Sequence, residues 1–223
     1  QDLSARTKDS YELSYRKMFR DTKAMCTYQN IVMQCRAVRN KYSANTYNIY
    51  LRAINVFVEF CKKKKIFKTT DKLYSELRRK DTSKKDVVTL QKEDMDRLLE
   101  YWHNKDREFY LLLKMLRFTG ARISETLRLK WKDINFQTGT IEYPNKVHGQ
   151  IQYFPITPQI AEILTELRSI NNKSTNVFRW SHTTYSRLRL WLSASMQELG
   201  IELGKGNAFH VIRKTFATEL FES

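Results

Sequence analysis

A polar segment near residue 80 is the feature that most limits how this chain of 223 residues can fold. The eight residues from Arg78 to Lys85 are five cations, one aspartate, one threonine and one serine. A stretch without apolar periodicity is typical of a solvated connection between domains. Because about 100 residues is an ordinary domain size, the sequence predicts two domains, residues 1–80 and 89–223, joined by a linker at residues 81–88.

The charge of the chain favours a polyanionic partner. It has 40 Lys and Arg against 24 Asp and Glu, a net charge of +16. Residues 1–86 contain 21 Lys and Arg and 9 Asp and Glu, whereas residues 87–223 contain 19 Lys and Arg and 15 Asp and Glu. The first domain is therefore predicted to have the stronger affinity for nucleic acid, with a membrane surface as the alternative. No apolar run nears the roughly 20 residues that span a bilayer.

The cysteines indicate neither a disulfide framework nor a zinc site. Cys26, Cys35 and Cys61 are an odd number, and no two have Cys-x-x-Cys spacing. They are predicted to be packed, reduced thiols of an intracellular protein. Since the chain begins at Gln1 with neither a methionine nor a signal-like segment, it is expected to be a fragment of a longer polypeptide.

Amphipathic helices are predicted in the first domain. Ser43 is a suitable N-cap for one that ends in four lysines, Lys62 to Lys65. Lysines in a last turn interact favourably with the helix dipole, so they can simply form a solvated helix end. Contact with phosphates is the alternative interpretation. The residues at helical spacing are Tyr11, Tyr15, Met18 and Phe19; Ile31, Cys35 and Val38; and Tyr47, Leu51, Ile54 and Val58, with Tyr50 and Phe57 beside them. The aromatic stripe of the third helix is predicted to be core rather than a base-stacking platform.

The second domain is predicted to be mainly helical with one small antiparallel sheet. A helix capped by Thr89 runs through Trp102, and an apolar helix then ends at Gly120, where glycine suits a left-handed position. A short helix is expected from Arg122 to Leu129, with its first turn able to face an anion.

Alternating polar and apolar residues predict the strands. They lie around Ile134, from Ile141 to Tyr143 after a Thr138-Gly139 turn, and up to Phe154. Helical spacing returns from Pro158 and continues over 184–199 and 208–220.

Two arginines and a histidine offer cations and a hydrogen bond to one phosphodiester. Arg122 follows a Thr-Gly turn, and His210 precedes Arg213 by three residues, about one helical turn, so that both can face the same phosphate. Guanidinium groups match phosphate oxygens bidentately and stay charged at any working pH. Lys146, in the strand-turn-strand pattern, adds a further cation, and Glu125 is expected to orient Arg122 or its neighbours without touching DNA.

The order Arg122, Lys146, His210, Arg213 on helix, hairpin and helix resembles the catalytic domain of tyrosine recombinases, the phage and transposon integrase family. The likeness covers residues 87–223 well and residues 1–80 in outline, where it implies the family's DNA-binding core-binding domain. It implies that Lys146 is the general acid for the leaving 5′-oxygen and that His210 binds the phosphate and shares in proton transfer. Lys130, Lys132 and His148 are the competing cations. Taken singly, a capping Arg122, a solvated Lys146 and a packed His210 would each have a purely structural explanation.

The resemblance also requires a His or Trp and a nucleophilic tyrosine after Arg213, and these are expected to lie beyond Ser223. Tyr143, Tyr153 and Tyr185 precede Arg213 and fall in strand or helix patterns. They are predicted to be core or surface residues, so this fragment is expected to be inactive in cleavage.

The implied reaction is attack of tyrosine on DNA to give a 3′-phosphotyrosyl link, then rejoining to a partner strand, with no metal and no cofactor. The implied partners are double-stranded DNA, a homotetramer on DNA and an accessory DNA-bending or directionality factor, in a cytoplasmic, nucleoid-associated protein encoded by a bacterium, phage or mobile element. The missing N-terminal methionine suggests a removed arm-binding domain. The predicted DNA-binding residues are Lys62, Lys63, Lys64, Lys65, Arg78, Arg79, Lys84 and Lys85.

Two other functions stay open at this point. A type IB topoisomerase uses a similar set of residues but relaxes supercoiled DNA as a monomer without site preference. A DNA-binding protein with the recombinase fold and no catalysis is the second.

Overall fold

The computed structural model describes residues 5–19, 27–69, 72–79, 88–144, 151–202 and 208–222. The chain divides into two compact units, residues 1–85 and 86–223, and each has its own hydrophobic core. Residues 81–87 of the expected linker lie outside the described residues.

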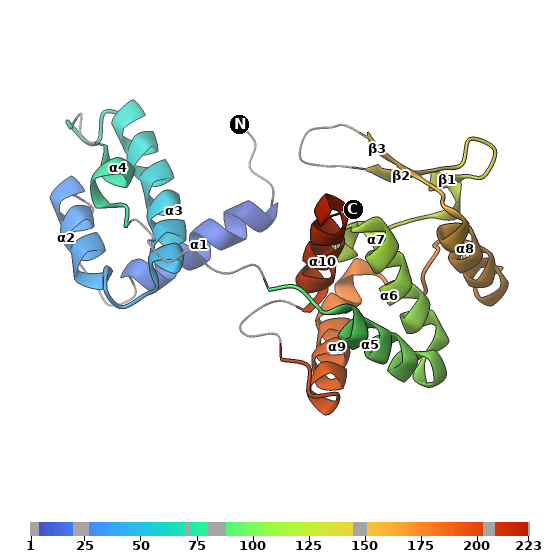
Figure 1. The fold of residues 1–223 in the computed structure, drawn as a ribbon. Helices are drawn as coiled ribbons and strands as arrows, with labels where there is room; N and C mark the ends of the chain where they lie inside the picture. The colour runs from blue at the N-terminus through green and yellow to red at the C-terminus, as the bar shows by residue number, and fades with distance from the viewer. Residues whose placement is uncertain are drawn as a thin grey trace. The chain divides into compact units, whose positions relative to one another are not determined.

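The first unit is helical, with α1 (Ala5–Phe19), α2 (Tyr28–Val38), α3 (Ala44–Lys63) and α4 (Leu73–Leu77) (Figure 1). The predicted cap of α3 is confirmed, because the Ser43 Oγ accepts a hydrogen bond from the Thr46 N–H at 3.3 Å. Apart from Tyr11, which is half-buried and outside the core cluster, the residues of the predicted stripes are confirmed as core. Buried together are Met18, Ile31, Cys35, Val38, Tyr47, Leu51, Ile54 and Val58, with Tyr15, Phe19, Tyr50 and Phe57 packed against them.

Arg79, the last described residue of the first unit, is fixed to α3. The Asn48 side-chain amide donates to the Arg79 carbonyl at 2.7 Å, and its oxygen accepts from the Arg79 N–H at 2.9 Å. The Arg79 Nη1 donates to the carbonyls of Arg39 and Tyr42, both at 2.9 Å. Arg79 is therefore a tertiary clamp as well as a cation.

The second unit contains α5 (Lys92–Lys105), α6 (Arg107–Thr119), α7 (Ile123–Thr126), α8 (Pro158–Ile170), α9 (Tyr185–Glu198) and α10 (Ala208–Glu222), with 3-10 turns η1 (Trp131–Asp133) and η2 (His182–Thr184). α6 packs against α5, α8 and α10. The aromatic part of the second unit's core centres on Phe109. Its ring centroid lies 4.4 Å from that of Trp102, and the ring also contacts Trp180, Trp191 and Phe209.

Two predicted helix boundaries are wrong, because at each one the backbone makes a hydrogen bond with a segment far away in the sequence. Thr89 does not cap α5, which begins at Lys92, since the Leu90 N–H donates to the Thr215 Oγ1 on α10 at 2.8 Å. α7 ends at Thr126, short of the expected Leu129. The Leu129 carbonyl instead accepts from the Val177 N–H at 3.0 Å.

The small antiparallel sheet is confirmed, and the fold as a whole is mainly helical. Its strands are β1 (Ile134–Asn135), β2 (Thr140–Pro144) and β3 (Ile151–Pro155), in the order β1-β2-β3. Ile141 pairs with Ile134 and Phe154, and Tyr143 pairs with Gln152. The sheet lies beside α8 and α7 in Figure 1, so the end of β2 approaches the turn that follows α6.

Candidate active site

The turn after α6 is held in one conformation. Gly120 caps the helix at φ +56°, the left-handed region that favours glycine, as predicted. A Cβ atom there would lie 2.2 Å from the Phe216 Cδ1 on α10, so the close approach of the two elements also requires glycine. The Thr119 Oγ1 donates to the Met115 carbonyl at 2.7 Å and accepts from the Ala121 N–H at 3.2 Å.

Arg122 occupies the N-cap position of α7, directly after this turn. Its Nη1 donates to the Glu125 Oε1 at 2.8 Å, and its backbone N–H donates to the Glu125 Oε2 at 3.1 Å. The Glu125 side chain is 15% exposed and that of Arg122 52% exposed. The less exposed carboxylate therefore holds one edge of an outward-facing guanidinium, an arrangement that suits the orienting role expected of Glu125.

Helix α10 carries Arg213 to the same turn. Phe209, Val211 and Ile212 are buried and attach this helix to the core. The half-buried Arg213 then donates from its Nη1 to the Gly120 carbonyl at 2.5 Å. His210, one turn earlier, is exposed. Two arginines 91 positions apart in the chain are thus attached to one turn. Arg122 directly follows the turn in the sequence, and Arg213 reaches it through a hydrogen bond.

A cavity of about 460 Å³ adjoins this turn. Arg213 and Glu125 are the charged members of its described lining. The other lining residues are Thr119, Gly120, Ala121, Tyr143, Gln152, Tyr153, Phe154, Phe216, Ala217 and Leu220. The cavity is therefore mainly apolar, with its charges beside the Gly120 turn.

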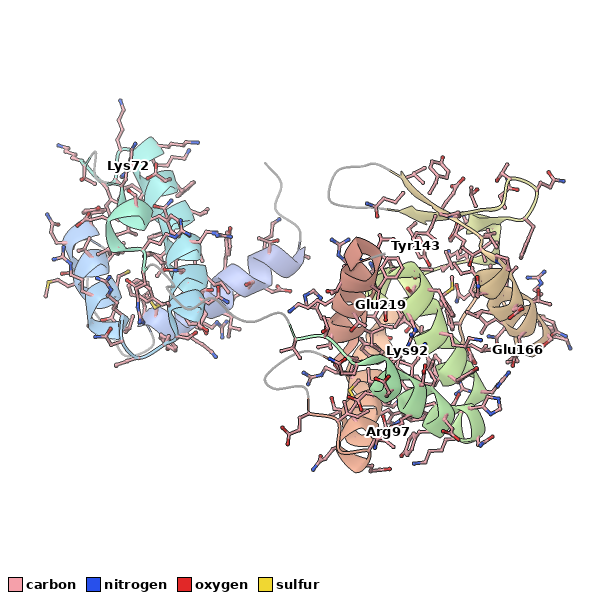
Figure 2. The ribbon with its side chains drawn as sticks, in the orientation of Figure 1. Lys72, Lys92, Arg97, Tyr143, Glu166 and Glu219 are labelled. Atoms are coloured by element: carbon pink, nitrogen blue, oxygen red, sulfur yellow. The ribbon has the colours of Figure 1, made fainter. Side chains whose placement is uncertain are left out.

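Tyr143, which is labelled in Figure 2, lies on β2, and its hydroxyl is near the hydroxyls of Thr119 and Thr126. It is 4% exposed, and its hydroxyl makes no well-formed hydrogen bond to the described residues, although it lies near both threonines. Burial raises the pKa of Tyr143 above its ordinary value, so the phenol stays protonated. These features suit a core residue. Tyr153 is exposed on β3, and the half-buried Tyr185 packs on Phe209.

Lys146 and His148 lie outside the described residues, which stop at Pro144 on β2 and resume at Ile151 on β3. Of the other competing cations, Lys130 and Lys132 are exposed around η1. The Lys130 N–H donates to Asp133 at 3.0 Å.

The cations predicted to bind DNA in the first unit differ in their surroundings. Lys63, Lys64 and Lys65 are exposed, and Lys62 pairs with Glu59 at 3.1 Å. The Arg78 guanidinium lies 5.6 Å from the centre of the Tyr74 ring. Lys84 and Lys85 lie outside the described residues.

Sequence reasoning missed Phe216 and Asn48, although each fixes the backbone beside a predicted site residue. Phe216 lies 96 positions from Gly120, and no local pattern links the two. A polar Asn48 between Tyr47 and Leu51 was the one available signal of the clamp on Arg79. Among the described residues, no group of three His, Cys, Asp or Glu could hold a metal ion, and no helix is long and apolar enough to cross a membrane.

The fold is that of the DNA integrases. A lambda integrase dimer bound to a COC′ core site superposes with a TM-score of 0.78 at 14% identity, covering 97% of this chain and 80% of that one. A lambda integrase tetramer bound to a Holliday junction superposes with a TM-score of 0.79 at 13% identity, covering 100% and 66%.

Residues 88–223 match the model of the Phage integrase family, so the chain belongs to that family. The predicted resemblance to tyrosine recombinases is confirmed. Among curated relatives, the tyrosine recombinase XerA of Pyrococcus furiosus is 28% identical over 187 residues, which are 82% of this chain and 64% of that protein. The chain thus spans less than two thirds of this relative.

Proposed function

We propose that this chain is the core-binding and catalytic part of a site-specific DNA recombinase, which cuts and rejoins strands through a 3′-phosphotyrosine intermediate to integrate or excise a mobile element. In this proposal the first unit binds DNA and the second performs the chemistry. The observation that carries it is the hydrogen bond from Arg213 to the Gly120 carbonyl, because it brings a second guanidinium to the turn that presents Arg122.

Arg122 and Arg213 bracket the scissile phosphate and stabilise the negative charge that grows on its non-bridging oxygens. Glu125 keeps Arg122 in place through the pair at 2.8 Å. His210, exposed one turn before Arg213, donates a hydrogen bond to the phosphate. The attacking tyrosine hydroxyl gives its proton to His210 as its oxygen forms the new bond to phosphorus. The bond to the 5′-oxygen breaks, and Lys146 gives that oxygen its proton.

No tyrosine follows Arg213 in these 223 residues. Tyr143 is buried and protonated, and Tyr185 is packed against Phe209, so neither suits attack on DNA. We propose that the nucleophile comes from polypeptide outside this sequence.

The proposed partner is duplex DNA, contacted by the cations of the first unit, and the proposed assembly is a homotetramer that joins two duplexes. The net charge of +16 and the likeness to a lambda integrase tetramer on a Holliday junction support this. An accessory DNA-bending or directionality factor and a cytoplasmic, nucleoid-associated location complete the proposal.

The test is a phosphate scan on a duplex that the purified chain selects from a randomised library. Each phosphate in turn is replaced by an uncharged methylphosphonate, and affinity is measured for the unchanged chain, Arg122→Ala and Arg213→Ala. At one phosphate we expect the unchanged chain to lose about 10- to 100-fold, the range of a charge-assisted hydrogen bond, and both variants to lose much less.

Arg128→Ala is the matched control, because Arg128 is exposed just after α7. It is expected to weaken binding without changing the dependence on that phosphate. If no phosphate shows coupling to both arginines, the proposed site is refuted.

A further inference from the structure

The C-terminal end of α3 contains a lysine in an unfavourable backbone conformation. Lys65 has φ +58° and is the one non-glycine residue with positive φ in the described part of the chain. Its N–H donates to the Lys62 carbonyl at 2.9 Å, and the next N–H, of Ile66, donates to the Cys61 carbonyl at 2.8 Å. Glycine adopts this conformation readily, whereas a lysine there is strained. Strain of this kind is often retained where the side chain has a function.

The same residue lines an open hollow of about 590 Å³. Lys62, Phe67, Lys68 and Thr69 are the other lining residues, so three of the five are cations. Glu59 is the one carboxylate in residues 59–68, and it pairs with Lys62 at 3.1 Å. Lys63 and Lys64 are exposed beside the hollow.

The helix dipole does not account for this concentration of charge. A helix C-terminus carries the equivalent of roughly half a negative charge, whereas residues 59–68 hold five lysines and one glutamate. Backbone N–H groups already donate to the last carbonyls, including that of Phe60, which accepts from Lys64 at 3.0 Å. The lysine side chains are therefore in excess of what the helix end needs.

We propose that Lys62, Lys65 and Lys68 form a phosphate-binding pocket that holds the backbone of duplex DNA at the C-terminal end of α3. The choice of DNA as the polyanion rests on the proposed function. An ammonium group offers three hydrogen-bond donors and no acceptor, so three such groups suit phosphate oxygens. Contacts of this kind carry little information about base sequence. The pocket explains why a lysine stands at residue 65, since glycine would remove the strain together with the cation.

The decisive variant is Lys65→Gly, because strain and charge predict opposite effects. Thermal unfolding should show a midpoint equal to or above that of the unchanged chain. Duplex binding, measured over a series of salt concentrations, should lose about 0.9 from the slope of log affinity against log salt, or about eightfold in affinity at 0.1 M. Lys68→Ala should give the same loss without changing the backbone at residue 65.

Lys105→Ala is the control, because Lys105 lies on α5 and its Nζ is 3.7 Å from a Glu198 oxygen. It should leave the salt slope unchanged. If the unchanged chain binds duplex DNA and both pocket variants bind it with the same slope, the pocket is refuted while the proposed function stands. If the unchanged chain shows no salt-dependent binding, both proposals fall.

Discussion

Replacing Gly120 by alanine tests the close approach of α10 to the turn after α6, the turn to which Arg122 and Arg213 are both attached. Alanine at φ +56° costs about 1 to 2 kcal/mol in backbone strain. The new Cβ would also lie 2.2 Å from Phe216, so the aromatic ring must move, at the roughly 1 to 3 kcal/mol typical of overpacking. We therefore expect the second unit to lose about 2 to 5 kcal/mol of unfolding free energy.

Gly139 provides the matched control for this substitution. It has φ +64°, but a Cβ there meets no atom within 4 Å. Gly139→Ala should therefore cost only the backbone term of about 1 to 2 kcal/mol. Urea denaturation of both variants isolates the contact with Phe216. Phe216→Ala should destabilise the Gly120→Ala variant by less than it destabilises the unchanged chain. Equal destabilisation by the two glycine substitutions would refute the reasoning.

Three further predictions concern other parts of the chain. Asn48→Ala removes both hydrogen bonds to the Arg79 backbone, so the first unit should lose about 1 to 3 kcal/mol of unfolding free energy in urea. Burial raises the pKa of Tyr47 from 10.0 to about 12. The protonated phenol therefore makes its full contribution to the unfolding free energy below pH 10, and this contribution should fall by about 2 to 3 kcal/mol as the pH rises to about 12. Unfolding of Tyr47→Phe at each pH should show a smaller loss, and an identical loss would contradict the assignment. In protein that includes the tyrosine, Arg122→Lys and Arg213→Lys should each reduce strand cleavage by roughly 100-fold or more, because lysine lacks the planar fork; cleavage at a near-normal rate in either variant would remove that residue from the site.

The helices with a strong local pattern could be predicted from the sequence. The apolar spacing from Tyr47 to Val58 and the Ser43 cap defined α3, because helix hydrogen bonds and caps join residues only a few positions apart. Gly120 marked the end of α6 for the same reason, since a left-handed residue is a local requirement. The start of α5 could not be predicted, because a hydrogen bond from Leu90 to Thr215, 125 positions away, decides it.

The residue types of the candidate site follow from the sequence, whereas their arrangement depends on the tertiary structure. The chemistry of Arg122, His210 and Arg213 indicates a phosphodiester wherever they lie, and their assignment to one site stays a prediction. Only the packing of α10 on α6 brings Arg213 to the Gly120 carbonyl and Phe216 against Gly120. The sequence by itself determined the short-range features, namely the helices with a strong local pattern, the caps and the charge. The tertiary structure decided which distant residues meet, because those contacts form only when separate elements bury their apolar faces together.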